Sequence, residues 1–153
     1  MEWQRQQFIV TDQRAVLNDE LIHRFLSTES YWAKGIAKAT VVKSLDQSLC
    51  FGLFEMHPSG THSQIGLGRV ITDRTTFAYL ADVFVLQQYR GQGLGKWLVD
   101  CILSYPDLQG LRRWMLATGD AHEFYRRYGF TESPVGRLME KVDAEFLKNS
   151  SSQ

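Results

Sequence analysis

The sequence predicts a mixed α/β domain (α+β type) built on one central, mostly antiparallel sheet. Three β-rich stretches follow one another in the middle of the chain with only short turns between them, and connections that short favour antiparallel neighbours. Helical patterns lie before and after these strands. The pattern after the third strand repeats its apolar residues at i, i+3, i+4, i+7 and i+8, as an amphipathic helix packed on a sheet does.

The N-terminal third of the chain predicts one strand and two helices. Residues 8–11 form a short apolar and β-branched run that is typical of a strand. Asn18 can cap a first helix, whose first turn is acidic as the helix dipole favours. Apolar residues at helical spacing predict a second helix over residues 30–45, although Gly35 weakens it.

The middle of the chain predicts three strands and the amphipathic helix. The strands cover residues 49–55, 63–72 and 76–86, which are rich in apolar, aromatic and β-branched side chains. The helix begins at Leu94 after a glycine-rich turn and ends before Pro106, which cannot continue a helix.

The last third predicts another strand, a short helix and the closing strands of the sheet. The strand covers residues 114–118, and the helix lies within residues 121–128. Gly129 stands where a left-handed C-cap is expected. Residues 131–142 are expected to add one or two strands, and residues 143–153 to form a partly disordered tail after a single domain over residues 1–142.

Composition indicates a folded protein without a general affinity for polyanions. The chain has 153 residues, 44% of them hydrophobic, and its 17 basic and 17 acidic residues cancel. That balance argues against nucleic-acid or membrane-surface binding. Cys50 and Cys101 lie among apolar neighbours without the spacing of a metal site, so we expect two buried thiols. No apolar run reaches the ~20 residues of a membrane span, and the first residues do not resemble a signal peptide. A cytoplasmic location is therefore expected.

The glycine-rich turn before the amphipathic helix predicts a phosphate-binding site. Gly91, Gly93 and Gly95 alternate there. Glycines let the backbone bend sharply and keep side chains off its surface. Successive N–H groups at a helix N-terminus then bind phosphate or pyrophosphate. A Walker A loop is excluded because Trp97 stands where it needs Ser or Thr, and a dinucleotide fingerprint because Lys96 stands where it needs glycine.

A third motif, Arg/Gln-x-x-Gly-x-Gly/Ala, does fit, with Arg90, Gly93 and Gly95. About 30 residues later, the segment 121–130 ends in Tyr-Gly-Phe. On these two motifs the chain resembles the GNAT superfamily of acyl-CoA-dependent N-acetyltransferases, over roughly residues 8–142. The resemblance implies a mixed, mostly antiparallel sheet of about six to seven strands flanked by about four helices.

The resemblance also implies acetyl-CoA as the cosubstrate, held largely by main-chain atoms, and no metal. In the family, the backbone of one strand pairs with the pantetheine arm, and the amides that follow hold the pyrophosphate. Pairing of this kind does not depend on particular side chains. Carried over, the residues that would meet pantetheine are Val83, Phe84 and Val85. Those that would meet the pyrophosphate are Arg90, Gly91, Gln92, Gly93, Leu94, Gly95 and Lys96.

The implied reaction is direct transfer of acetyl to a primary amine in a ternary complex, with Tyr125 as the general acid. A phenol can donate a proton to the departing thiolate, and the backbone amide of Val83 is expected to meet the oxyanion. Tyr125 shares its helix face with Phe124 and Tyr128, so a role in the core is the alternative.

Asp82 is the candidate general base. Strand alternation places it on one face with Leu80 and Phe84, and a carboxylate on an apolar face is uncommon unless it is paired or functional. Burial would make it a better base, acting directly or through water. The alternative is a buried carboxylate bonded to the backbone or to an arginine.

The acceptor is expected to be a small-molecule or peptide amine. Tyr31 and Trp32 fall in the region that builds the acceptor cleft in the family, where a cation could rest on an aromatic ring. A hydrophobic anchor at the start of a helix is the alternative. Two other functions stay open, a non-catalytic acyl-CoA-binding or sensing module and a partner-binding domain without a nucleotide ligand. A monomer and a homodimer both fit the sequence.

Overall fold

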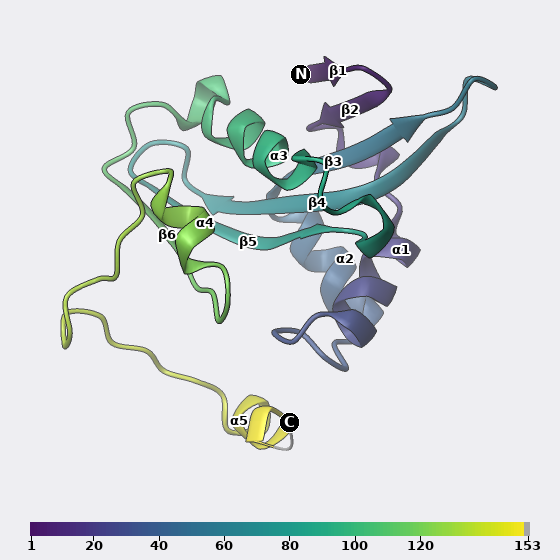
Figure 1. Cartoon of the computed structure of the whole chain (residues 1–153). Coiled ribbons are helices and arrows are strands. Elements are labelled where there is room, and N and C mark those ends of the chain that lie inside the picture. The colour runs from purple at the N-terminus through teal and green to yellow at the C-terminus, as the bar shows by residue number, and fades with distance from the viewer. Residues whose placement is uncertain (152–153) are drawn as a thin grey trace. The chain divides into compact units, whose positions relative to one another are not determined.

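A six-stranded sheet is the centre of the first of two compact units, Met1–Ala117. The computed structural model describes residues 1–151, and the side chains of residues 1–148. Within that part of the chain the strands lie side by side in sequence order, β1 to β6 (Figure 1). Each neighbouring pair is antiparallel except β5 and β6, which run parallel. The predicted mixed, mostly antiparallel sheet is confirmed.

The strands of the middle of the chain lie within two residues of their predicted bounds. The six are β1 (Glu2–Arg5), β2 (Phe8–Thr11), β3 (Leu49–Met56), β4 (His62–Thr72), β5 (Phe77–Val85) and β6 (Arg113–Leu116). Strand β1 was not predicted. It forms a hairpin with β2 through Gln6, whose φ is +54°. Such turns usually contain Gly or Asn, and glutamine gave no turn signal.

The first helix is capped as predicted, and the second is shorter than predicted. Helix α1 (Asp19–Arg24) begins after Asn18, whose side chain accepts a hydrogen bond from the Leu21 N–H at 3.0 Å. It continues as a π-helix over Phe25–Glu29. Helix α2 covers only Lys38–Asp46, so the prediction of a helix from residue 30 was wrong.

The segment before α2 is a loop because its polar groups bond locally. The Ser30 hydroxyl donates to the Leu26 carbonyl at 2.6 Å and accepts from the Ala33 N–H at 3.1 Å. Gly35 takes a left-handed φ of +74°. These contacts end the preceding helix and compete with a new one, and the apolar spacing alone did not reveal them.

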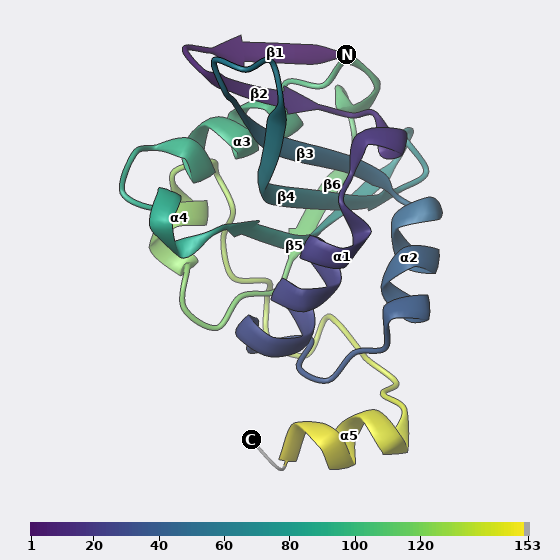
Figure 2. The ribbon, with the colours of Figure 1, turned by 90° about the vertical axis from the view of Figure 1, so that its right-hand side faces the viewer.

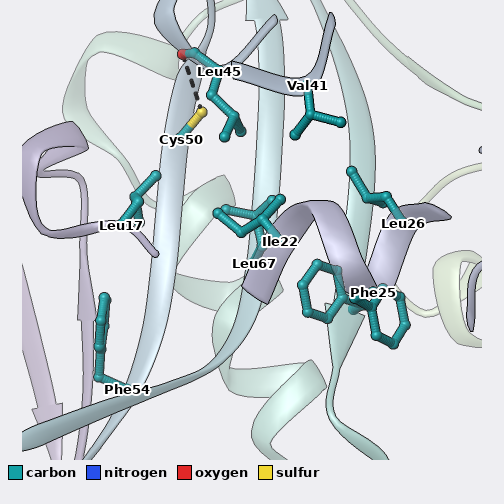
Figure 3. Packing of buried hydrophobic residues seen from close by; sticks show 10 residues of the cluster. Leu17, Ile22, Phe25, Leu26, Val41, Leu45, Cys50, Phe54 and Leu67 are labelled. Atoms are coloured by element: carbon teal, nitrogen blue, oxygen red, sulfur yellow. Dashed lines mark hydrogen bonds between the residues drawn. The ribbon is translucent and has the colours of Figure 1, made fainter. Parts of the chain in front are cut away.

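Helices α1 and α2 cover one face of the sheet, and α3 (Leu94–Leu103) covers the other (Figures 1 and 2). The α1–α2 face buries a continuous apolar cluster (Figure 3). Its members are Leu17, Ile22, Phe25, Leu26, Val41, Leu45, Cys50, Phe54, Leu67 and Phe84. On the α3 face, a Cβ added to Gly68 would lie 2.5 Å from Ile102 Cδ1. Glycine at 68 therefore permits the close approach of α3.

The second unit begins at Thr118 and contains α4 (His122–Arg126) and α5 (Ala144–Ser151). The strands expected over residues 131–142 do not form in the described chain. Pro134 accepts a turn hydrogen bond from the Arg137 N–H at 3.2 Å, and Gly136 has φ +80°, so this stretch bends instead of extending. In the segment expected to be a tail, the Asp143 side chain accepts from the Glu145 N–H at 2.9 Å at the start of α5.

Residues 152–153 of that expected tail lie outside the described residues. The single domain over residues 1–142 stays a prediction. Among the described residues, the helices are all too short or too polar to cross a membrane.

Candidate functional site

The glycine-rich turn between β5 and α3 presents a row of backbone N–H groups that have no acceptor among the described residues. Gly91 and Gly93 both have left-handed backbones, with φ +82° and +74°. Gly93 is the N-cap residue of α3, and the first backbone bond of the helix runs from the Trp97 N–H to the Gly93 carbonyl at 3.1 Å. Left-handed residues in such a turn gather successive N–H groups into an anion-binding nest.

The free donors of this turn are main-chain groups. Within the described chain, no protein acceptor takes the backbone N–H of Gly91, Gln92, Gly93, Leu94 or Gly95. A Cβ added to Gly91 would meet no atom within 4 Å. Donors in open space at the start of a ten-residue helix are the arrangement that binds a phosphate group.

Positive side chains lie beside these donors. Arg90 at the start of the turn donates from Nε to the Val85 carbonyl at 2.9 Å, which ties it to the end of β5. Arg5 from β1 reaches the turn as well, with its Nη1 3.5 Å from the Gly93 carbonyl. Guanidinium groups pair well with phosphate oxygens. Sequence reasoning missed Arg5 because it did not recognise the β1–β2 hairpin.

Lys96, which was predicted to add a pyrophosphate amide, lies in the first turn of α3. Its ammonium pairs with Asp100 at 3.0 Å, one turn along the helix, and both side chains are exposed. Exposed pairs of this spacing contribute little to stability. The side chain of Lys96 is thus partly engaged along its own helix.

Strand β5 changes its hydrogen bonding at a β-bulge. Arg69 of β4 pairs with Ala81, while Leu67 pairs with Phe84. Gly68 therefore lies opposite two residues, Asp82 and Val83, and Asp82 adopts φ +52°. A bulge of this kind bends the strand and interrupts its ladder.

The part of β5 predicted to bind pantetheine has no strand on its other side. Strand β6 pairs with β5 only along Phe77–Leu80, so within the described residues no strand pairs with residues 81–85 on that edge. Val83 is half-buried there, whereas Phe84 and Val85 are buried. An extended ligand can add to such an edge through main-chain hydrogen bonds.

The bulge corrects the predicted faces of β5. Leu80 lies opposite Val70, and Phe84 lies opposite Leu67. Because opposite residues share a face and side chains alternate along β4, Leu80 and Phe84 point to opposite faces. The simple alternation that put them together with Asp82 was wrong, since the bulge inserts one residue between them.

The Asp82 carboxylate is bonded on both oxygens. Its Oδ2 accepts from Arg69 Nε at 2.8 Å, and its Oδ1 accepts from Trp32 Nε1 at 2.8 Å. Arg69 also donates from Nη1 to the Ser48 hydroxyl at 3.1 Å. The side chains of Asp82 and Arg69 are only 10% and 15% exposed. The structure thus contains the arginine pairing that was the alternative to a base, and the base hypothesis stays a prediction.

Tyr31 and Trp32 lie in the loop between the π-helix and α2, and a row of aromatic rings joins them to β5. Phe84 stacks on Phe25 with ring centroids 3.8 Å apart, and Phe25 lies 6.4 Å from Trp32. Tyr31 packs edge-on against Trp32 at 5.1 Å. Trp32 is 37% exposed and Tyr31 is 50% exposed, so both rings combine contact with the protein and access from solvent.

A pocket of about 480 Å³ adjoins the glycine turn in the same unit. Arg24, Phe25 and Glu29 line it on one side. Residues 86–88 and Arg90 line the other. Side chains of both charge signs suit a polar ligand more than an apolar one.

Tyr125 belongs to the second unit, in α4, where its ring makes aromatic contacts. It packs edge-on against Phe124 at 5.0 Å and against Phe130 at 6.0 Å. Gly129 has φ +88°, and the Phe130 N–H donates to the Tyr125 carbonyl at 3.3 Å. The predicted left-handed C-cap is confirmed, and its apolar contact runs between Phe130 and Tyr125.

Comparison with known proteins identifies a family. Residues 46–132 match the model of the acetyltransferase (GNAT) domain. A protein from Gibberella zeae named as an acetyltransferase is 36% identical over 148 residues, covering 85% of this chain and 82% of that protein.

Solved structures give the same result. A crystal structure assigned to the GNAT acetyltransferase family from Xanthomonas campestris pv. campestris is 48% identical, with a TM-score of 0.81 over 89% of this chain and 93% of that one. A structure of Rv2747 from Mycobacterium tuberculosis in complex with CoA shares the fold, with a TM-score of 0.63 at 22% identity over 94% of this chain and 81% of that one. The resemblance stated from the two motifs is confirmed.

Proposed function

This chain belongs to the GNAT acetyltransferase family, and from that premise we propose that it transfers acetyl from acetyl-CoA to a primary amine of a small molecule or peptide. The observation that carries the proposal is the row of unbonded N–H groups from Gly91 to Gly95 at the start of α3. These donors fit a pyrophosphate, and the unpaired edge of β5 fits the pantetheine arm that follows it in CoA.

Cofactor binding in this proposal depends mainly on the main chain. The pyrophosphate accepts hydrogen bonds from the turn, with Arg90 and Arg5 adding positive charge. Pantetheine extends along Val83, Phe84 and Val85. The complex of Rv2747 with CoA supports this choice of ligand within the fold.

The proposed reaction is one displacement at the thioester carbonyl. The neutral amine attacks the carbonyl carbon, a C–N bond forms, and the oxyanion is held by the Val83 N–H. The C–S bond then breaks, and Tyr125 donates its phenolic proton to the departing thiolate of CoA. The amine's own proton passes to Asp82 or to water. No metal is needed at any step.

The test of this proposal is an acceptor screen. Acetyl-CoA is mixed with the protein and a panel of small amines, amino acids and peptide N-termini, and release of the CoA thiol is followed. Thiol release that requires both the protein and an amine supports the transferase. If the protein binds acetyl-CoA but releases no CoA thiol with any amine of the panel, the proposal is contradicted.

Substitution of Tyr125→Phe tests the proposed acid. We expect kcat to fall about 100-fold, because a general acid contributes about 10²–10⁴-fold, while the KM for acetyl-CoA changes by less than about threefold. Tyr128→Phe, just beyond the end of α4, is the matched control and should leave kcat near the wild-type value. Unchanged turnover in Tyr125→Phe would remove the assignment.

A second candidate function is a non-catalytic acyl-CoA-binding or sensing module. The engagement of both Asp82 oxygens by Arg69 and Trp32 favours it, since no free base is then present at the bulge. In a thermal-shift titration, a ligand at about 100 times its Kd stabilises the protein by ~2.7 kcal/mol. Such a shift without thiol release would favour this function, and no shift would favour a partner-binding domain.

We also propose a cytoplasmic location. Both cysteines are buried free thiols in the structure, which suits a reducing compartment. Whether the protein acts as a monomer or a homodimer stays a prediction for size-exclusion chromatography with light scattering.

A further inference from the structure

Asp82 combines a strained backbone with a side chain that accepts a hydrogen bond on each carboxylate oxygen. Its φ of +52° lies in the left-handed region, which costs a residue other than glycine about 1–2 kcal/mol. Glycine would fit the same bulge without that cost. The hydrogen bonds to its carboxylate therefore help to hold Asp82 in place.

The two partners of Asp82 come from opposite sides of the site. Arg69 belongs to the neighbouring strand β4 and is itself tied to Ser48 at the start of β3. Trp32 belongs to the loop before α2, 50 residues away in sequence. One carboxylate thus bonds the sheet at the bulge and the aromatic loop at the same time.

The loop is also held by apolar packing of Ala33 and Ile36 against the buried cluster, and by a bond between the His23 ring and the Ile36 carbonyl at 3.0 Å. The Gly35 N–H donates to the Ser27 carbonyl at 3.0 Å, and the remaining backbone bonds of the loop are equally local. The Trp32 ring also contacts Phe25, which stacks on Phe84 of β5. The bond from the Trp32 indole to Asp82 is a direct polar connection between this loop and β5.

We propose that Asp82 is a positioning residue, which fixes the Tyr31–Trp32 loop against the bulge of β5 and does not accept the amine proton. This inference rests on the proposed function for its kinetic part only. The Asp82 carboxylate accepts two hydrogen bonds at 2.8 Å, one of them from a guanidinium, and taking a proton would remove the negative charge that strengthens that bond. By holding the loop, Asp82 sets the distance between the acceptor side and the strand expected to meet the thioester.

Kinetics of Trp32→Phe, Asp82→Asn and the double variant test the proposal. Trp32→Phe keeps an aromatic ring but removes the indole N–H, and Asp82→Asn keeps the size but removes the charge. We expect each to raise the KM for the amine about tenfold, with the KM for acetyl-CoA within about twofold. Asn has an oxygen for only one of the two donors, and the charged Arg69 takes it, so the bond to Trp32 is lost in both variants. The double variant should therefore resemble Asp82→Asn and not show the product of the two effects.

The pH dependence separates positioning from base catalysis. The pH profile of kcat/KM should keep its shape in Asp82→Asn, because the proposed role of Asp82 is to hold the loop and not to accept the amine proton. A fall in kcat above about 100-fold in Asp82→Asn, with loss of the acidic limb of the pH profile and a normal Trp32→Phe, would overturn the proposal. Effects of the two variants that multiply would overturn it too.

A measurement without turnover tests the attachment itself. In ¹⁵N–¹H spectra, the Trp32 indole signal is identified by its absence in Trp32→Phe. We expect it to exchange slowly with solvent in the wild type, and to shift and exchange faster in Asp82→Asn. If the indole signal has the same chemical shift and exchange rate in Asp82→Asn as in the wild type, the proposal is contradicted. If the signal responds but no amine is acetylated, the proposed function fails and the attachment stands.

Two substitutions of the same chemical kind serve as controls. Trp3→Phe makes the same ring change in β1, away from the bulge. Asp107→Asn removes an ion pair with Arg74 at 2.9 Å, in which both side chains are about half exposed. Both should leave the KM for the amine near the wild-type value. If they raise it as much as Trp32→Phe and Asp82→Asn do, the effect is not specific to the bulge and the proposal fails.

Discussion

The glycine turn and the bulge of β5 differ in whether their polar groups are hydrogen-bonded, although fewer than ten residues separate them. The N–H groups of Gly91 to Gly95 bond to no acceptor in the described chain, and a Cβ added to Gly91 would meet no atom within 4 Å. At the bulge, both oxygens of Asp82 are bonded and the side chain is only 10% exposed. Unsatisfied donors at a surface are available to a ligand, whereas a satisfied, buried carboxylate holds the protein together.

The comparison separates two kinds of mutational effect. A change in the glycine turn should weaken ligand binding while altering stability little beyond backbone strain. A change at the bulge should lower the free energy of unfolding, because it leaves a buried partner without its counter-charge.

The largest effect is expected for Arg69→Gln. This change leaves the mostly buried Asp82 carboxylate without its cation, and breaking such a pair from one side costs about 3–5 kcal/mol. We expect the free energy of unfolding, from urea titration, to fall by about 3 kcal/mol. Arg74→Gln, which breaks the exposed pair with Asp107, should cost less than about 1 kcal/mol. Equal losses of unfolding free energy in the two variants would show that the ion pair at the bulge is no better shielded from solvent than the pair at the surface.

Gly91→Asp should act on the ligand instead. The new carboxylate would stand beside the phosphate-binding N–H groups, and we expect the affinity for acetyl-CoA by calorimetry to fall at least about tenfold. Gly110→Asp is the matched control, because Gly110 also has a left-handed backbone, with φ +74°, and open space around its Cβ position. Both variants carry a similar strain of about 1–2 kcal/mol. If the two bind acetyl-CoA equally well, the turn is not the phosphate site.

Burial of the region around Arg69 should also affect the pH dependence of stability. Cys50 pairs with Arg69 in the sheet register, and burial raises the pKa of its thiol to about 12. Below pH ~8.5, the thiol is protonated in both states and its contribution is fully present. Above that, the unfolded thiol ionises first, so stability is lost as the pH rises toward about 12.

Comparison of the wild type with Cys50→Ala measures this contribution. Between pH 9 and 10, the wild type should lose about 1 kcal/mol more of its free energy of unfolding than the variant does. Urea titrations at the two pH values give the difference. Parallel losses would mean that the thiol is not shielded in the folded protein.

The smallest effect is expected for Lys96→Gln. If main-chain N–H groups hold the pyrophosphate, removing this charge should change the affinity for acetyl-CoA by less than about threefold. Calorimetry at two salt concentrations checks it, since an exposed charge contributes less as salt rises. A loss as large as that of Gly91→Asp would transfer the main role from the backbone to this side chain.

The sequence was sufficient to predict the elements that depend on local patterns. Strands β3, β4 and β5 follow runs of apolar and β-branched residues, and α3 follows an amphipathic repeat. The glycine-rich turn could be located because glycine at 91 and 93 is itself the cause of its geometry. In these places the residue type and the structure are directly linked.

The arrangement at the bulge could not be predicted, because its causes are not local. A left-handed residue is usually recognised as Gly or Asn, and here it is Asp82. Its partners Trp32 and Arg69 lie 50 and 13 residues away. Strand β1 escaped notice for a similar reason, since Gln6 takes a positive φ without a typical turn residue, and with it Arg5 was missed.

The unpaired edge of β5 also bears on how the protein avoids aggregation. A bare strand edge is a template on which another chain can add, and proteins protect such edges with bulges and inward-pointing charges. Asp82 supplies both features beside the stretch that lacks a strand partner in the described chain. The bulge thus leaves this edge accessible to an extended ligand but hinders pairing with a strand of another chain. Without the bulge, we expect β5 to promote aggregation.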